Sequence, residues 1–114
     1  MSIESAITLA AMSERELRNA VIEALEMRGY FVVWLANEFL RERFKSKGLR
    51  KGLPDLLVLG EDETAFFIEL KAGRNGLTEA QKAIKAELEK RGFKVFVIRS
   101  LDELKQNFTE YEQA

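Results

Sequence analysis

The sequence contains no histidine and no cysteine. Without histidine, the chain cannot form a Ser-His-Asp or Cys-His catalytic group, a histidine-ligated zinc hydrolase site, or a nuclease site with histidine as the general base. Without cysteine, it has neither a disulfide framework nor a thiolate metal site. Any catalysis must therefore rely on carboxylates, lysine, tyrosine or a metal ion bound by oxygen atoms.

Several longer patterns are also absent. No apolar run approaches the ~18 residues of a membrane span, and the first residues, Met1-Ser2-Ile3-Glu4, lack the basic segment of a secretory signal. No G-x-x-x-x-G-K-[ST] phosphate loop occurs. The 114 residues are enough for one domain but not for two. We therefore expect a single cytoplasmic domain with no membrane contact and no organic cofactor.

The only proline, Pro54, stands immediately before Asp55 and the apolar run 56–59. Proline has a fixed φ angle and no N–H group, so it suits the start of a strand rather than its middle. Asp55 is therefore predicted at the mouth of a strand. The acidic turn 60–63 leads into a second apolar run, 64–71, so we expect the two strands to pair as an antiparallel hairpin.

Charged residues occupy one face of the second strand. Because side chains alternate along a strand, Glu69 and Lys71 lie opposite Ile68 and Leu70. If the strands pair, Asp55 and Glu69 converge with Lys71 beside them. Two carboxylates and the Leu70 carbonyl suit Mg²⁺, and Mn²⁺ is expected to substitute for it. Lys71 would orient the nucleophilic water or neutralise charge on a phosphate, as phosphodiester hydrolysis requires.

A second interpretation of these residues stays open. The same pattern fits a polar edge strand in which Glu69 and Lys71 form a solvated pair and Asp55 is a turn residue. In that case, the charges would stabilise the surface and carry no chemistry.

A block of positive charge precedes the proline. The whole chain has a net charge of −1, whereas residues 41–51 hold six Lys or Arg and one Glu. Beside a phosphate-hydrolysing site, these cations are predicted to contact DNA phosphates; the alternative is a solvated loop with flexible points at Gly48 and Gly52. The candidate DNA contacts are Arg41, Arg43, Lys45, Lys47, Arg50 and Lys51, with Arg74 in the glycine-containing loop 72–76.

Helix start and stop signals divide the rest of the chain. Ser13 and Glu16 form a capping-box pattern, as do Thr78 and Gln81, and Gly29 is a typical helix stop. The predicted elements are helix 13–28, strand 30–35 buried on both faces, a short helix 37–44, strands 56–59 and 64–71, a helix from 78 that packs through Ala80, Ala83, Ile84 and Leu88 and ends at Gly92, strand 93–98, and a helix from Ser100 to about residue 108.

This order predicts an α/β domain with a mixed sheet of about four strands and helices on both faces. The domain is expected to span residues 13–108. Residues 1–12 would form an N-terminal arm or a short helix, and residues 109–114 a fraying tail.

Taken together and in this order, the motifs resemble the PD-(D/E)XK nuclease superfamily, and within it the virus-type replication-repair nuclease (VRR-NUC) domain. The resemblance covers about residues 13–104. It implies a restriction-endonuclease-like core. The segments that carry it are 13–18, Gly52-Leu53-Pro54-Asp55-Leu56-Leu57-Val58, Phe67-Ile68-Glu69-Leu70-Lys71, and Gly76-Leu77-Thr78-Glu79-Ala80-Gln81.

The resemblance also implies roles for two further residues. Glu14 would reach the metal ion or its water, and Gln81 would orient Lys71, the water or the scissile phosphate. A capping role alone is the structural alternative for Gln81, because one amide has few donors and acceptors to share between two tasks. At position 18, this chain has Arg where members of the family tend to have Gln.

Small stand-alone members of this family occur in phages and bacteria, so the resemblance implies a cytoplasmic, structure-selective DNA endonuclease. Such an enzyme can act as a homodimer on branched DNA such as a Holliday junction. Two other classes stay open: a nucleic-acid-binding module with a disused site, and a small interaction domain with solvated charges.

Overall fold

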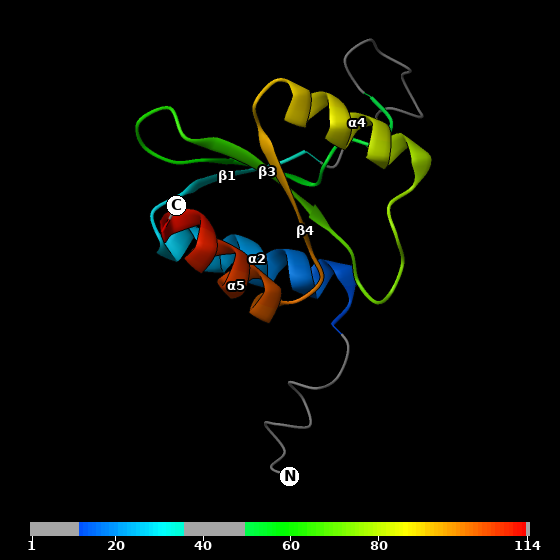
Figure 1. Cartoon of the computed structure of the whole chain (residues 1–114). Coiled ribbons are helices and arrows are strands. Elements are labelled where there is room, and N and C mark those ends of the chain that lie inside the picture. Colours follow the sequence, from blue (N-terminus) through cyan, green and yellow to red (C-terminus); the bar gives the residue numbers. More distant parts are fainter. Residues whose placement is uncertain (1–11, 36–49, 114) are drawn as a thin grey trace.

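The computed structural model describes residues 12–35 and 50–113. Figure 1 shows three layers, with α2 and α5 side by side on one face of a sheet and α4 on the other face. The predicted α/β class is confirmed. The elements, in chain order, are α2 (Glu14–Met27), β1 (Phe31–Trp34), β2 (Leu56–Leu59), β3 (Ala65–Leu70), α4 (Glu79–Lys90), β4 (Lys94–Ile98) and α5 (Leu101–Gln113).

The four strands lie in the order β1-β2-β3-β4. The pairs β1–β2 and β2–β3 are antiparallel, and β3–β4 is parallel. A parallel pair needs a crossover connection, and α4 provides it between β3 and β4. The predicted hairpin and the predicted mixed sheet of four strands are therefore both confirmed.

The hydrophobic core lies between the sheet and the pair α2/α5. Alternate residues of the two central strands are fully buried there, because side chains on a strand point to opposite faces in turn. On α2, the buried residues recur at intervals of four, which places them on one side of the helix. The buried strand residues are Leu56, Val58, Phe66 and Ile68, and those of α2 are Leu17, Val21 and Leu25.

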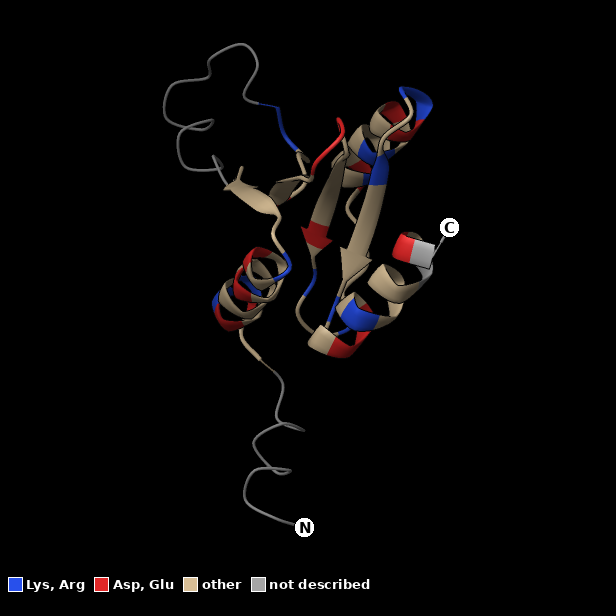
Figure 2. Ribbon diagram, turned by 90° about the vertical axis from the view of Figure 1, so that its left-hand side faces the viewer, with Lys and Arg blue, Asp and Glu red and all other residues tan. Residues whose placement is uncertain are grey.

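Charged residues enter the described strands at two positions, Glu69 near the end of β3 and Lys94 at the start of β4 (Figure 2). Glu69 is out of phase with Phe66 and Ile68, so it faces α4 rather than the main core. The sequence predicted this face for Glu69 correctly.

The helix boundaries follow the local signals. The Ser13 hydroxyl accepts a hydrogen bond from the Glu16 amide at 3.2 Å, which satisfies one of the free N–H groups at the start of α2. The helix stops before Gly29, whose φ of 90° is readily adopted only by glycine. Gly92 ends α4 in the same way, with a φ of 93°.

The expectation that the first strand is buried on both faces is wrong. β1 is an edge strand, and Phe31 and Trp34 are 67% and 53% exposed. The absence of alternation reflects apolar residues exposed at a sheet edge, not burial from both sides. The Arg18 guanidinium lies over the Trp34 ring, 4.1 Å from its centroid, so α2 partly covers this aromatic.

The last helix is longer than the sequence indicated. α5 continues beyond Phe108 to Gln113, because Tyr111 extends the apolar stripe by one further turn. The Tyr111 ring packs against Phe66 and Phe96, with centroids 5.3 and 5.6 Å away. Residues 109–113, predicted to belong to a fraying tail, are therefore part of α5 in the structure.

The helix α4 packs less tightly than predicted. None of its residues is fully buried, and Ala83, one of the four predicted packing residues, is exposed.

No helix in the described part of the chain is both long and apolar enough to cross a membrane. The predicted arm 1–12, apart from Met12, and the predicted helix 37–44 lie outside the described residues.

Candidate functional site

Asp55 and Glu69 come together at one end of the central strand pair. Leu56 is paired with Ile68, so the next residues outward, Asp55 and Glu69, face each other across the two strands. Asp55 Oδ2 accepts a hydrogen bond from the Leu70 amide at 2.7 Å. The convergence predicted from strand alternation is therefore present in the structure.

Backbone contacts hold Asp55 in place from the other side. Its carbonyl accepts a hydrogen bond from the Leu35 amide at 2.7 Å, which continues the β1–β2 pairing past Leu56. Asp55 thus bridges β1 through its backbone and β3 through its side chain. Because both its backbone and its side chain are already held, Asp55 loses little further conformational freedom when it binds a ligand.

Glu69 is buried, with 5% of its surface exposed, and it is the one buried polar residue in the described part of the chain. Its Oε1 accepts a hydrogen bond from Gln81 Nε2 at 2.9 Å. Glu69 also lies opposite Asp55 across the β2–β3 pair. Burial of an acid is costly unless the group is hydrogen-bonded or neutralised, so this position indicates a functional constraint.

The two acids perturb each other's ionisation. Burial, then the Asp55 charge and the hydrogen bond to Asp55, raise the pKa of Glu69 to about 8, while Lys71 opposes the rise. Burial also raises the pKa of Asp55, although the Leu70 amide hydrogen bond lowers it. Keeping two neighbouring carboxylates charged costs electrostatic free energy. The pair therefore favours either a shared proton or a bound cation.

Gln81 serves the helix cap and the acidic pair at the same time. Its Oε1 accepts a hydrogen bond from the Thr78 amide at 2.9 Å, and the Gln81 amide donates to the Thr78 hydroxyl at 3.1 Å. The side-chain nitrogen remains available for Glu69. The side-chain oxygen caps the helix while the nitrogen contacts Glu69, so these two contacts use different atoms of the same amide.

Gly52 is a close-packing residue rather than the flexible point that the sequence indicated. Its φ is 88°, and a Cβ built on it would lie 2.5 Å from the Ala80 carbonyl carbon and oxygen. Only glycine lets the segment before Pro54 approach the first turn of α4 this closely. The contact sets the position of Asp55 relative to Gln81.

Lys71 and Glu14 flank the pair. Lys71 directly follows β3, its amide donates to the Ile98 carbonyl at 3.0 Å, and its charge lowers the pKa of both acids. Glu14, an exposed residue in the first turn of α2, raises the pKa of both through its negative charge.

The described residues contain no cluster of three or more Asp, Glu, His or Cys side chains arranged to hold a metal ion. Asp55 and Glu69, which face each other across β2 and β3, are two acids that could share a metal ion. Mg²⁺ is commonly held by one or two carboxylates, with water and substrate oxygens completing its shell. The donor set thus fits a hard divalent cation.

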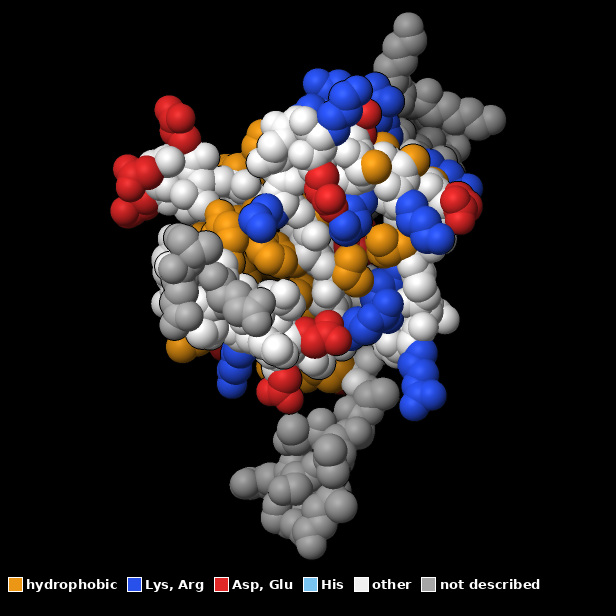
Figure 3. Space-filling model, in the orientation of Figure 1, with side chains coloured by type: hydrophobic (Ala, Val, Ile, Leu, Met, Phe, Trp, Pro, Cys, Tyr) orange, Lys and Arg blue, Asp and Glu red, His pale blue; other side chains and the backbone are white. Residues whose placement is uncertain are grey.

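The predicted DNA contacts are only partly within the described residues. Arg50, Lys51 and Arg74 are exposed, whereas Arg41, Arg43, Lys45 and Lys47 lie outside the described ranges. Figure 3 shows that acidic side chains gather over the β2–β3 turn at the left, away from most Lys and Arg side chains. The acids of that turn, Glu61, Asp62 and Glu63, are all exposed.

One residue of this region was missed by sequence reasoning. Arg99 Nη1 donates to the Gly73 and Asn75 carbonyls, at 3.0 and 2.7 Å, in the loop after Lys71. Its only signal in the sequence is its place directly after the last strand. That signal becomes informative only when β4 is known to run parallel to β3.

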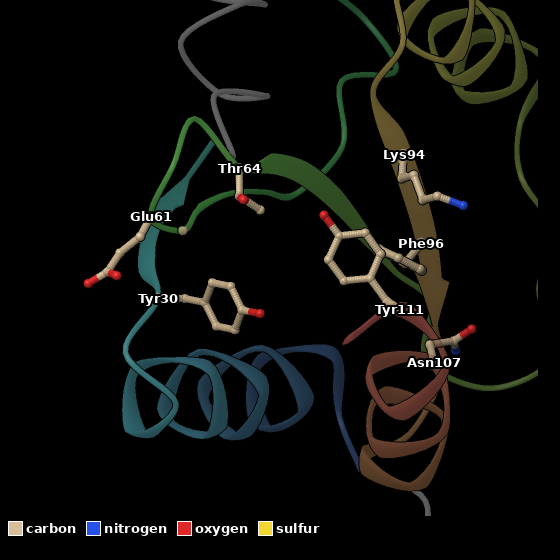
Figure 4. A pocket seen from close by; sticks show the side chains of 8 residues that line it. Tyr30, Glu61, Thr64, Lys94, Phe96, Asn107 and Tyr111 are labelled. Carbon is tan, nitrogen blue, oxygen red and sulfur yellow. The ribbon is translucent and has the colours of Figure 1, made fainter. Parts of the chain in front are cut away.

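A separate depression of about 640 Å³ lies at the opposite end of the strands. Figure 4 shows its lining side chains, which come from the β2–β3 turn, β4, α5 and the residue before β1. It includes none of the predicted site residues. The lining residues are Tyr30, Gly60, Glu61, Thr64, Lys94, Phe96, Asn107 and Tyr111.

Comparison with known proteins identifies the family. The model of the VRR-NUC domain matches residues 11–102, most of the chain. The chain belongs to the VRR-NUC family. A solved structure described as a VRR-NUC domain is 27% identical, with a TM-score of 0.70, and the match covers 86% of this chain and 96% of that one. No match was found among curated proteins.

The resemblance inferred from the motifs is thus confirmed, and the four-stranded mixed sheet is the fold of a VRR-NUC domain. Membership of the family implies a nuclease-type fold. The two acids, Lys71 and Gln81 lie together within that fold.

Proposed function

We propose that this VRR-NUC protein is a metal-dependent DNA endonuclease that hydrolyses phosphodiester bonds. The observation that supports this most is the burial of Glu69 against Asp55, with Gln81 hydrogen-bonded to it. A solvated edge-strand pair would expose Glu69, and it would not raise the pKa of that acid to about 8.

Asp55, Glu69 and the Leu70 carbonyl would hold Mg²⁺, or Mn²⁺ in its place, with Glu14 acting on the ion or its water. When bound, such an ion lowers the pKa of its water and polarises a phosphoryl oxygen. The mutual repulsion of the two acids in the buried pair supports this assignment, because a cation between them removes it.

The remaining roles belong to the chain's own side chains. Lys71 orients the attacking water or neutralises charge on the phosphate in the transition state. Gln81 fixes the orientation of the Glu69 carboxylate through its amide nitrogen, and it is itself held rigid by the α4 cap. Arg50, Lys51 and Arg74 contact the DNA backbone, together with the basic residues of 41–47.

The proposed substrate class rests on the resemblance to small stand-alone members of the family. We propose a structure-selective enzyme that acts on branched DNA, such as a Holliday junction, as a homodimer that supplies two sites for paired nicks. The small size of the chain supports a dimer, because one copy offers little surface for a branched substrate.

The test is cleavage of linear, flap and four-way DNAs with and without Mg²⁺ or Mn²⁺, followed on native and denaturing gels. Wild-type protein is expected to cleave only with the metal, and Asp55→Asn or Glu69→Gln is expected to reduce cleavage by at least about a hundredfold. Glu61→Gln, in the exposed acidic turn, is the charge-matched control and should cleave normally.

Circular dichroism should show that both site variants remain folded. Cleavage at wild-type rate by both would remove the site assignment. Metal-independent binding of branched DNA without any cleavage would instead show a binding module with a disused site.

A further inference from the structure

We propose that Arg99 is a positioning residue for the nuclease site, because it clamps the loop that joins Lys71 to α4. Its kinetic consequence rests on the proposed function, whereas the clamp itself does not. The loop 72–77 begins directly after Lys71 and ends at Thr78, which caps the helix that carries Gln81. The loop therefore connects the two groups that flank Glu69, and its conformation affects their alignment.

The loop has little else to hold it. Gly73, Arg74, Asn75 and Gly76 are all exposed, and Gly73 has a φ of 73°. Within the described residues, the hydrogen bonds made by this loop are the two that Arg99 Nη1 donates to the Gly73 and Asn75 carbonyls. Ala72 and Leu77 are half-buried at its two ends, but the exposed stretch between them contains two glycines and would otherwise have high conformational freedom.

Arg99 is itself fixed to the core. It follows Ile98, which is fully buried at the end of β4. Its amide donates to Glu103 Oε2 at 2.7 Å, and the Glu103 amide donates to the Ser100 hydroxyl at 3.1 Å. The first turn of α5 thus holds the backbone of Arg99. The Arg99 guanidinium then connects this fixed backbone to the exposed part of the loop.

The strand register brings Arg99 next to the start of the loop. Glu69 pairs with Val97 and Leu70 with Ile98, so the next positions outward are Lys71 and Arg99. The Lys71 amide donates to the Ile98 carbonyl, which extends the parallel pairing to this point. Arg99 therefore sits beside Lys71 and reaches over the loop that leaves it.

The competing explanation is that Arg99 binds a DNA phosphate directly. Kinetics separate the two roles. A phosphate contact acts mainly on substrate binding, so its loss raises KM and lowers the salt dependence of binding by about one ion. A clamp acts on the alignment of Lys71 and Gln81, so its loss lowers kcat while KM and the salt dependence change little.

The kinetic experiment compares wild type, Arg99→Ala and Arg99→Lys with Arg91→Ala. Arg91 is an exposed cation at the end of α4 that pairs with Glu87, so its removal controls for charge. We expect Arg99→Ala to lower kcat by about tenfold or more with KM unchanged, Arg99→Lys to restore part of it, and Arg91→Ala to match wild type. A raised KM with unchanged kcat would overturn the clamp.

A second measurement does not depend on activity. Arg74 lies in the clamped loop, so trypsin cuts the Arg74–Asn75 bond only when the loop opens. Mass spectrometry of brief digests should show faster cleavage there in Arg99→Ala, by about tenfold relative to cleavage after Arg91. Arg99→Lys should be intermediate. An unchanged relative rate in both variants would overturn the clamp even if the protein cleaves DNA.

Failure of the proposed function would look different. Wild-type protein would then cleave no DNA, yet Arg99→Ala would still open the loop to trypsin. If Arg99→Ala does not fold, the Arg99→Lys digest decides the question alone, since it retains the charge and most of the side-chain length.

Discussion

At the scale of single residues, the site places two acidic side chains beside each other where burial makes it unfavourable for both to be ionised. Strand alternation was enough to predict that Asp55 and Glu69 converge, because both lie on the non-core face of neighbouring strands. The double use of Gln81 could not be predicted, since it depends on where α4 is docked on the sheet. The same holds for Arg99, which reaches its loop only through tertiary packing.

The raised pKa of Glu69 has a consequence for stability. Its folded-state pKa of about 8 is above its ordinary value of 4.5, so the folded state binds a proton that the unfolded state has released. In metal-free buffer, this group therefore stabilises the fold fully below pH ~4.5, and that contribution is lost as the pH rises towards 8.

Glu69→Gln keeps the shape and removes the titration. We expect it to flatten the fall in the free energy of unfolding between pH 5 and 8, which for one proton is at most about 1.4 kcal/mol per pH unit. Urea unfolding across this range measures the effect, with Glu61→Gln as control. An equal pH dependence in wild type and Glu69→Gln would contradict the raised pKa.

At the scale of elements, local signals account for most of the fold. Ser13, Thr78, Gly29 and Gly92 mark helix ends as the sequence indicated, and the two central strands follow their alternation. β1 was predicted less well, because an apolar strand at a sheet edge and one buried on both faces have similar sequences. Element composition does not reveal position in the sheet.

Gly52 shows how an element contact depends on one missing side chain. Gly52→Ala should cost the strain of a positive φ, about 1–2 kcal/mol, and in addition the clash with the Ala80 backbone. Gly29→Ala is the matched control, because its φ is 90° but nothing lies within 4 Å of the added Cβ. Urea unfolding should show a larger loss for Gly52→Ala, and equal losses would contradict the close approach.

At the scale of the whole molecule, charge is separated along the strands. The acidic turn 61–63 lies at one end of the β2–β3 hairpin, and the carboxylate pair lies at the other end, with Lys71, Arg74 and Arg99 nearby in sequence or register. The net charge of −1 hides this arrangement. Under the proposed function, DNA would approach the carboxylate end, and the acidic turn would repel it from the opposite end.

The separation predicts which cations matter for binding. Arg74→Ala should weaken DNA binding at every sequence and reduce the slope of log K against log salt by about 0.9, the value for one phosphate contact. Lys85→Ala, in α4 and paired with Glu89, should leave the slope unchanged. Fluorescence anisotropy at several salt concentrations measures both, and equal slopes for Arg74→Ala and wild type would exclude the contact.

The central claim is that Asp55 and Glu69 jointly bind a divalent cation. Anomalous diffraction from crystals grown with Mn²⁺ tests it most directly, because the signal locates the ion without reference to activity. We predict an anomalous peak between the carboxylates of Asp55 and Glu69 that disappears in Glu69→Gln crystals. A peak at another site, or none at saturating Mn²⁺, would contradict the account.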